Sequence, residues 1–267
     1  MLIDAHHHLL TEPGYADKLV AACHDLGIDR VCVFGAGPQN LPYGIADNDA
    51  VLAAMQAHPD RIIAFAYFML GKDRPQLIDA FVARGFRGVK FIYPTRNYDD
   101  EAFYPVYERV EKHGIPAVFH LGIVARTPTD KEWDIHNDRH RPIYLDTLAR
   151  AFPAMKLVGA HLGNPWYEEA AMVCRWNTNL YFDLSGSTLK CKSPQFLGDL
   201  LWWTPTTRYR DPLRRNAWEK IVFGSDVHAH EIHDVLTDYR RVMNHLSLAA
   251  DVQNKILGGT MAALLGL

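Results

Sequence analysis

Residues 62–68 read Ile-Ile-Ala-Phe-Ala-Tyr-Phe, a run that carries hydrophobic side chains on both faces of an extended chain. A strand with two apolar faces is typical of a parallel sheet that helices cover on both sides. Residues 48–57 and 75–84 place their apolar positions at helical spacing, which predicts one helix before the strand and one after it. This part of the chain therefore predicts an α/β fold.

The same alternation recurs along the chain, where we count eight strand-like runs with helical patterns between them. The predicted strands are Leu2–His6, Asp29–Phe34, Ile62–Phe68, Gly88–Tyr93, Pro116–Leu121, Lys156–His161, Leu180–Leu184 and Lys220–Gly224. The predicted helices are Ala16–Leu26, Asn48–Ala57, Pro75–Arg84, Glu101–His113, Ile143–Phe152, Trp166–Trp176, an irregular stretch Pro194–Trp218, and Glu231–His245.

Eight strand-helix units in about 250 residues are typical of a closed (β/α)8 barrel, the TIM barrel. A doubly wound open sheet is the alternative, but it would normally bring a Gly-rich phosphate loop after its first strand, and the sequence carries none there. No internal repeat, charge run or Ser/Gly linker marks a boundary. We predict a single TIM-barrel domain over residues 1–267.

Composition excludes several classes of protein. With 28 basic and 31 acidic residues the formal net charge is −3, so the chain lacks the basic field that nucleic-acid binding needs. The apolar runs fall far short of the roughly 20 residues of a membrane-spanning helix. The start carries no export signal, and the four cysteines form no Cys-x-x-Cys pair. We expect a reduced, cytoplasmic protein without nucleic-acid or membrane partners, with a homodimer as the default oligomer.

Polar residues with the chemistry of metal ligands follow the predicted strands. His6 and His8 are two apart on the first strand, so the alternation of a strand directs both side chains the same way. His120, His161 and Asp226 each close a buried run. Singly, each would be interpreted as a hydrogen-bonded strand end. Together they converge on the C-terminal mouth of the barrel, where barrel enzymes have their active sites, and predict a divalent-metal site.

Taken in order, these motifs resemble the amidohydrolase superfamily, in its amidohydrolase-related branch (amidohydrolase 2) of metal-dependent hydrolases, lactonases and nonoxidative decarboxylases. The resemblance spans nearly the whole chain and is carried by Asp4-Ala5-His6-His7-His8, Phe119-His120-Leu121-Gly122, Gly159-Ala160-His161-Leu162-Gly163, Leu180-Tyr181-Phe182-Asp183-Leu184-Ser185 and Phe223-Gly224-Ser225-Asp226. It implies that His6, His8, His120 and Asp226 bind one Zn²⁺ per chain, or another divalent transition metal such as Mn²⁺. It also implies that His161 is the base or substrate-orienting imidazole beside the metal-bound water, whose proton either Asp226 or His161 could take and return.

Lys90, on the predicted fourth strand, leaves three interpretations open. In binuclear members of the superfamily a carbamylated lysine on strand four bridges two metals, so the resemblance allows a second ion. An unmodified Lys90 could instead pair with a substrate carboxylate or with Asp226, or its side chain could extend past the barrel mouth to solvent. We adopt the mononuclear site, with Lys90 as a candidate catalytic and substrate-binding residue.

Three long connections, residues 35–47, 122–141 and 185–215, follow strands and are expected on the C-terminal face. Cationic side chains of the same face, which predict a small anionic substrate, are Lys90, Arg96, Arg126, Arg139 and Arg141. Residues just past strand ends that are predicted to wall the pocket are Tyr93, Trp166, His228 and His230. Trp202-Trp203 is predicted to pack the longest loop.

The sequence thus predicts a metal-dependent hydrolase in which a metal-bound hydroxide attacks the carbonyl of a small, carboxylated ester, lactone or amide. Two alternatives stay open. The same site could release CO₂ from an unsaturated or aromatic carboxylic acid, or the barrel could bind a ligand or metal without catalysis. The compact length favours hydrolysis, because the well-known decarboxylases of this branch tend to be longer.

Overall fold

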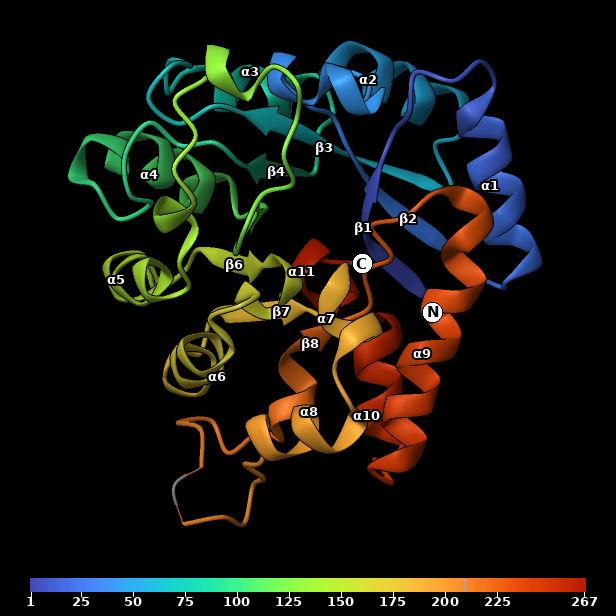
Figure 1. Ribbon diagram of the computed structural model, residues 1–267, viewed down its shortest axis with the longest axis vertical. Coiled ribbons are helices and arrows are strands. Elements are labelled where there is room, and N and C mark those ends of the chain that lie inside the picture. Colours follow the sequence, from blue (N-terminus) through green and yellow to red (C-terminus); the bar gives the residue numbers. More distant parts are fainter. Residues whose placement is uncertain (209) are drawn as a thin grey trace.

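The computed structural model describes residues 1–208 and 210–267. Within these residues, eight parallel strands follow one another in chain order around a barrel, and most of the helices lie outside them (Figure 1). The strands are β1 (Ile3–His8), β2 (Arg30–Phe34), β3 (Ile62–Phe68), β4 (Gly88–Phe91), β5 (Pro116–Phe119), β6 (Lys156–Gly159), β7 (Leu180–Asp183) and β8 (Ile221–Val222). Each predicted strand is therefore present, with ends that differ by a few residues.

Two backbone hydrogen bonds join the last strand to the first. The N–H of Ala5 donates to the carbonyl oxygen of Phe223 at 2.8 Å, and the N–H of Asp226 donates to that of His6 at 2.8 Å. These bonds bring the end of β8 against β1, so the sheet curls into a barrel and the open-sheet alternative is excluded. The second bond also places Asp226 beside β1.

Helices occupy the predicted segments between strands: α1 (Tyr15–Asp25), α2 (Asn48–Ala57), α3 (Leu77–Ala83), α4 (Tyr104–His113), α5 (Ile143–Ala151), α6 (Tyr167–Trp176) and α9 (Ile232–His245). Shorter helices complete the chain: α7 (Ser187–Cys191), α8 (Pro194–Leu200), α10 (Ala250–Asn254) and α11 (Thr260–Leu265).

The expectation of helical structure across Pro194–Trp218 is wrong beyond Leu200. The backbone from there to Asn216 is irregular in its described part. Tyr209, which falls both in this stretch and in the predicted long connection 185–215, lies outside the described residues. Pro205 and Pro212 explain the break, because proline lacks the N–H that a helix interior requires. Of the tryptophan pair only Trp203 packs inside, at 1% exposure, whereas Trp202 is 45% exposed.

The core has two layers. Residues of one parity on the strands, such as Val31 and Val33 of β2, pack against the surrounding helices. Residues of the other parity, such as Cys32 and Phe34, form a separate inner cluster with Met261 and other side chains of α11. Side chains therefore fill the barrel interior, so that space for a ligand remains at the C-terminal ends of the strands.

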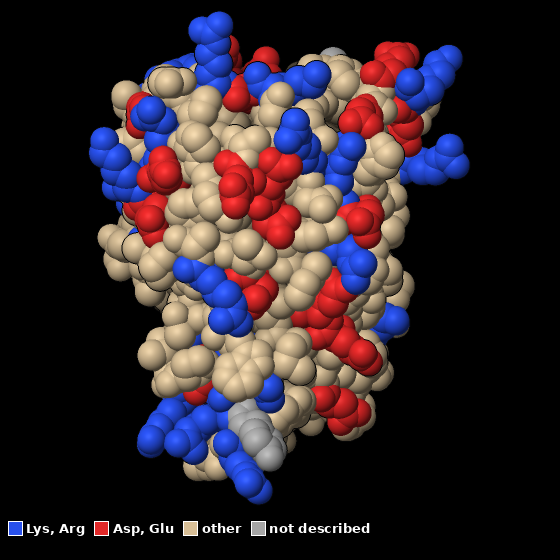
Figure 2. Space-filling view, turned by 90° about the vertical axis from the view of Figure 1, so that its left-hand side faces the viewer, with Lys and Arg blue, Asp and Glu red and all other residues tan. Residues whose placement is uncertain are grey.

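The surface carries both signs of charge. On the face drawn in Figure 2, Lys and Arg side chains intermingle with Asp and Glu over most of the area, in keeping with the net charge of −3. In the described ranges no helix has the length and apolarity that a bilayer crossing demands.

Candidate metal centre

Strand β1 directs two imidazoles into the barrel. Its pairing with β2 is irregular between Asp4 and His7, a bulge that places His6 beside the inner Phe34, with ring centroids 5.0 Å apart. His8 also lies against Phe34, at 5.6 Å. His7 points the other way, where its Nδ1 and Nε2 hydrogen-bond with the Ser225 and Tyr15 hydroxyls. The shared direction predicted for His6 and His8 is therefore present.

Backbone strain gathers at the ends of the strands. Among the described non-glycine residues with positive φ, four follow β4, β6 or β8: Tyr93 (56°), His161 (60°), Leu162 (47°) and Asp226 (47°). Such backbone costs about 1–3 kcal/mol per residue and persists where the surrounding structure enforces it, which is a common property of functional sites. Three of these side chains carry chemistry, so the strain marks this rim as the candidate site.

Asp226 lies at the centre of the cluster. Its Oδ1 is 3.6 Å from Nε2 of His8 and 3.7 Å from Nε2 of His6, and its Oδ2 is 3.7 Å from Nε2 of His161. His6, His8 and Asp226 offer ligand atoms that all lie within 4.8 Å of one another. Ligand atoms about 2 Å from one tetrahedral zinc ion lie about 3.3 Å apart. The spacing therefore fits one divalent ion.

The tautomer of His6 suits metal binding. Its Nδ1 is 2.8 Å from Oδ2 of Asp183 and donates to it, which leaves the lone pair on Nε2, where it accepts from Lys90 Nζ at 3.0 Å. A carboxylate on one ring nitrogen and an unprotonated second nitrogen is the usual arrangement of a metal-ligating histidine. A cation bound at Nε2 of His6 would take the place of the hydrogen bond from Lys90.

The remaining imidazoles are neutral donors. Burial holds the pKa of His8 and that of His120 well below the usual range, so both rings keep a lone pair at neutral pH. Within residues 1–208 and 210–267, Nε2 of His120 is buried without a hydrogen-bond partner, and so is Nδ1 of His8, the ring nitrogen opposite the one that faces Asp226. Buried polar atoms normally have a partner, so the orphaned Nε2 of His120 also favours a bound cation.

Asp226 is ionised beside these rings. Burial alone would raise the pKa of its carboxyl, but the electrostatic influence of the surrounding His6, His161, His8 and Lys90 side chains holds that pKa below its usual value. Two or three neutral imidazoles with one carboxylate form a donor set that suits zinc. The residues present therefore fit the predicted metal.

His120, the fourth predicted ligand, lies on the same rim but outside the group of atoms within 4.8 Å. Its ring centroid is 5.0 Å from that of His161 and 5.5 Å from that of His140, a buried histidine to which sequence reasoning assigned no role. A ligand role for His120 stays a prediction.

His161 is placed as a proton acceptor. Its Nδ1 lies 2.9 Å from the Ser185 hydroxyl, which orients the ring, and its Nε2 faces Oδ2 of Asp226. Burial lowers the pKa of His161, although the nearby carboxylates partly oppose that effect. The neutral ring can therefore take up a proton.

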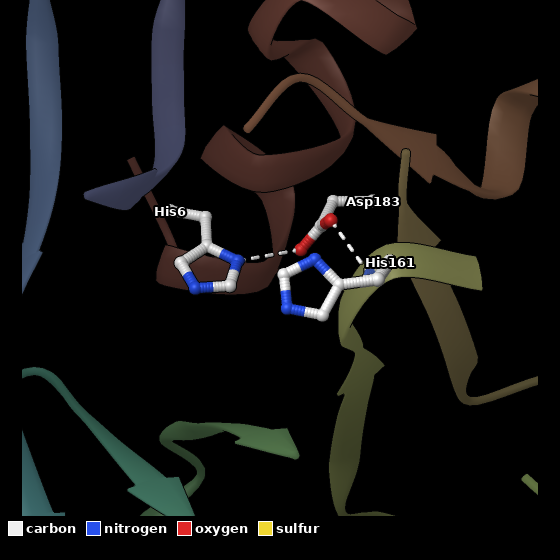
Figure 3. Close-up of side chains that lie close together, drawn as sticks. All are labelled: His6, His161 and Asp183. Atoms are coloured by element: carbon white, nitrogen blue, oxygen red, sulfur yellow. Dashed lines mark hydrogen bonds and ion pairs between the residues drawn. The ribbon is translucent and has the colours of Figure 1, made fainter. Parts of the chain in front are cut away.

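Asp183 connects the imidazole of His6 to the backbone of His161. One of its oxygens binds Nδ1 of His6, and the other accepts the backbone N–H of His161 at 2.9 Å (Figure 3). The sequence motif of β7 contains this residue, yet no role was assigned to it. The available signal was a carboxylate at the end of a buried strand, the same signal that identified Asp226.

We expect the substitution Asp183→Asn to weaken metal binding by about 10- to 100-fold, because the carboxylate fixes the tautomer of a ligating histidine. Competition titration with a chromogenic chelator measures this affinity. Asp211→Asn is the matched control, since Asp211 is equally buried but pairs with Arg215. Equal affinity in the two variants would exclude the positioning role of Asp183.

Lys90 does not extend to solvent at the mouth, so that interpretation is wrong. The side chain is 1% exposed, because it runs inside the barrel with Nζ 5.0 Å from the centre of the Phe34 ring and in contact with His6. Burial lowers the pKa of Lys90 to about 8, while Asp226 and Asp183 partly oppose the shift. Its pairing with a substrate and its carbamylation stay predictions.

A cavity of about 380 Å³ opens on this cluster. Its lining includes the predicted Tyr93, His120, Asp226 and His228, together with His8. The long connections after β2 and β5 line it as well, through Asn40, Tyr43, Ile45, Val124 and Ala125. Asn40 was not identified from sequence, because an asparagine in a loop carries no distinctive pattern.

The four predicted arginines are absent from the described lining of the cavity. Arg96 pairs with Asp100, Arg139 with Asp134, and Arg141 with Glu169. Arg126 is exposed and takes part through its backbone carbonyl, which accepts from the Tyr43 hydroxyl at 2.8 Å. Trp166 stacks with the guanidinium of Arg141. The described lining of the cavity contains no Lys or Arg, nor Trp166 or His230.

Comparisons with known proteins agree with this geometry. A family model described as "Amidohydrolase" matches residues 3–267. No curated protein matches the chain significantly.

Three solved structures with similar folds are informative. An uncharacterised TIM-barrel protein from Bordetella bronchiseptica is 19% identical, with a TM-score of 0.71 and coverage of 99% of this chain and 98% of its own. The 5-carboxyvanillate decarboxylase LigW from Sphingomonas paucimobilis is 16% identical, with a TM-score of 0.63 and coverage of 100% and 99%. The 4-oxalomesaconate hydratase LigJ from Rhodopseudomonas palustris is 17% identical, with a TM-score of 0.62 and coverage of 100% and 96%.

At these identities the structural likeness concerns the fold, whereas the family model covers almost every residue, including each strand end described above. The chain belongs to the amidohydrolase family.

Proposed function

We propose that the chain is a metal-dependent hydrolase that cleaves a small ester, lactone or amide. The observation that carries the proposal is the convergence of His6, His8 and Asp226, whose ligand atoms lie within 4.8 Å of one another, beside a cavity that His8 and Asp226 line. When bound there, a divalent ion supplies Lewis acidity, which polarises a carbonyl group and makes water more acidic. His6, His8 and Asp226 would hold the ion, with His120 as a further ligand.

Side chains of the protein carry out the proton transfers and shape the cavity. Oδ2 of Asp226 and Nε2 of His161, which are 3.7 Å apart, can accept a proton from the attacking water and return it to the leaving group. Ser185 keeps the imidazole of His161 oriented through Nδ1. Ile92 and Val227 line the cavity and exclude water from one side of the bound substrate.

Decarboxylation is the second candidate, because LigW, one of the proteins of similar fold, is a decarboxylase. Reactions in water enriched in ¹⁸O separate the two candidates when they are run on a panel of γ-lactones, methyl esters, anilides and unsaturated or aromatic carboxylic acids. Hydrolysis places ¹⁸O in the product and releases no CO₂. CO₂ release without ¹⁸O in the product would establish a lyase instead.

Metal removal tests the same proposal. Dialysis of the tag-free protein against a chelator should abolish turnover, and Zn²⁺ or Mn²⁺ should restore it, because the cation supplies the Lewis acid. Metal content measured by mass spectrometry should be about one ion per chain before dialysis. Turnover that persists at near-zero metal content would refute a metal-dependent mechanism.

A further inference from the structure

The cavity has a second polar group besides the metal ligands. Asn40, in the 3-10 segment Pro38–Tyr43 after β2, and Tyr93, after β4, both line the cavity and are 7% and 4% exposed. Nδ2 of Asn40 donates to the hydroxyl oxygen of Tyr93 at 3.3 Å. These two residues are termed the Asn40–Tyr93 pair.

The backbone of Tyr93 is strained. Its φ of 56° lies in the left-handed region, which an aromatic residue rarely adopts. Its backbone N–H donates to Nε2 of the buried His140 at 3.3 Å, and the ring meets that of His140 edge-on. Because strained backbone of this kind persists mainly where function needs it, the position of the phenol is itself evidence for a role.

The pair has unused hydrogen-bonding capacity. The Tyr93 oxygen accepts from Asn40, and across the described residues no acceptor lies within reach of the Tyr93 proton. Oδ1 of Asn40 is buried and has no donor in the same part of the chain. A buried amide oxygen without a partner is costly, so a ligand that supplies a donor recovers stability. The pair thus offers one donor and one acceptor.

The rest of the described cavity lining offers no Lys or Arg side chain that would stabilise a negatively charged substrate group. Leu10, Ile45, Ile92 and Val124 line the cavity, and its described lining lacks Lys and Arg. A carboxylate bound there would lose its hydration without meeting a cation. A neutral group would meet both hydrogen-bonding atoms of the pair without that penalty.

We propose that the Asn40–Tyr93 pair is a specificity subsite for a neutral substrate group that both donates and accepts a hydrogen bond, namely a carboxamide or a hydroxyl. The Tyr93 hydroxyl donates to the oxygen of that group, and Oδ1 of Asn40 accepts its N–H or O–H. The group belongs to a substrate whose scissile carbonyl binds at the metal site formed by His6, His8 and Asp226. This last placement rests on the proposed function.

Two sets of probes test the subsite and the metal site separately. Benzohydroxamates that carry a carbamoyl, carboxylate or methyl group, in para and meta series, combine a metal-binding end with a variable distal end. Titration calorimetry on the zinc-loaded full chain should give the carbamoyl probe about tenfold tighter binding than the carboxylate and methyl probes. A carboxylate probe that binds as tightly or more tightly would overturn the subsite and favour the anionic substrate.

Substitutions test whether the preference for the carbamoyl probe depends on the Asn40–Tyr93 pair. Tyr93→Phe removes one hydroxyl and should weaken the carbamoyl probe by about fivefold, the loss expected for one hydrogen bond, while leaving the methyl probe unchanged. Asn40→Leu should act in the same direction. Tyr43→Phe is the matched control, because Tyr43 lines the same cavity but its hydroxyl donates to the Arg126 carbonyl. An equal loss in Tyr43→Phe and Tyr93→Phe would refute the assignment to the pair.

A probe without a metal-binding end makes the two proposals independent. Binding of 4-methylbenzamide, followed by ligand-observed NMR, should weaken in Tyr93→Phe whether or not a metal is bound. Hydroxamates that bind no better than 4-methylbenzamide would contradict the proposed function, while a Tyr93-dependent affinity for the amide would still support the subsite. Absence of binding, or binding that Tyr93→Phe leaves unchanged, would overturn the subsite.

Discussion

The substitution Asp226→Asn should lower kcat/KM by about 10²- to 10⁴-fold, the range expected for loss of a positioned proton acceptor. Both carboxylate oxygens are used in the site, Oδ1 beside His6 and His8 and Oδ2 beside His161. The amide keeps the shape of the side chain but removes its charge, so metal binding should weaken as well. Steady-state kinetics and metal analysis of the same preparation give both readings.

A surface carboxylate provides the control for this prediction. Asp134→Asn changes an exposed residue that pairs with Arg139 in the loop after β5, and it should leave kcat/KM and metal content nearly unchanged. Circular dichroism establishes that both variants are folded. An Asp226→Asn enzyme within about threefold of the parent would remove this residue from the mechanism.

His161→Ala and His120→Ala should separate turnover from metal binding. His161 contacts Ser185 and Asp226, so its loss should spare metal occupancy and reduce kcat by about 10²- to 10⁴-fold. His120 carries an orphaned, buried Nε2, so its loss should reduce occupancy first, with turnover recovering in part at high metal concentration. Metal titrations followed by kinetics at each concentration distinguish the two patterns.

The contrast between these two variants matters more than either value alone. Equal loss of metal in both would show that His161 is a ligand and that the division of roles is wrong. Full occupancy in both would instead restrict the ligand set to His6, His8 and Asp226.

Sequence patterns predicted the barrel well because buried parallel strands leave continuous apolar runs, of which Ile62–Phe68 is the clearest. The same patterns located His161 and Asp226, since a polar residue directly after such a run stands at the mouth of the barrel. The helix predicted across Pro194–Trp218 failed beyond Leu200, where apolar spacing continues but two prolines interrupt the backbone.

The rest of the site depends on contacts that no local pattern records. Ala5 and His6 are adjacent in sequence, yet both side chains point into the barrel. Strict alternation along a strand would place them on opposite faces, and the bulge in β1 makes the shared direction possible. Asp183 is recognised only through its contact with His6, 177 positions away. Asn40 acquires meaning only beside Tyr93, which lies on another loop.

His6, His8 and Asp226 together are proposed to hold one divalent ion. Anomalous diffraction from crystals of the tag-free, zinc-loaded protein, recorded above and below the zinc edge, measures this directly. We expect a single peak per chain about 2.0–2.2 Å from Nε2 of His6, Nε2 of His8 and a carboxylate oxygen of Asp226. A map without a peak among these three side chains, or with the ion bound by other residues, would contradict it.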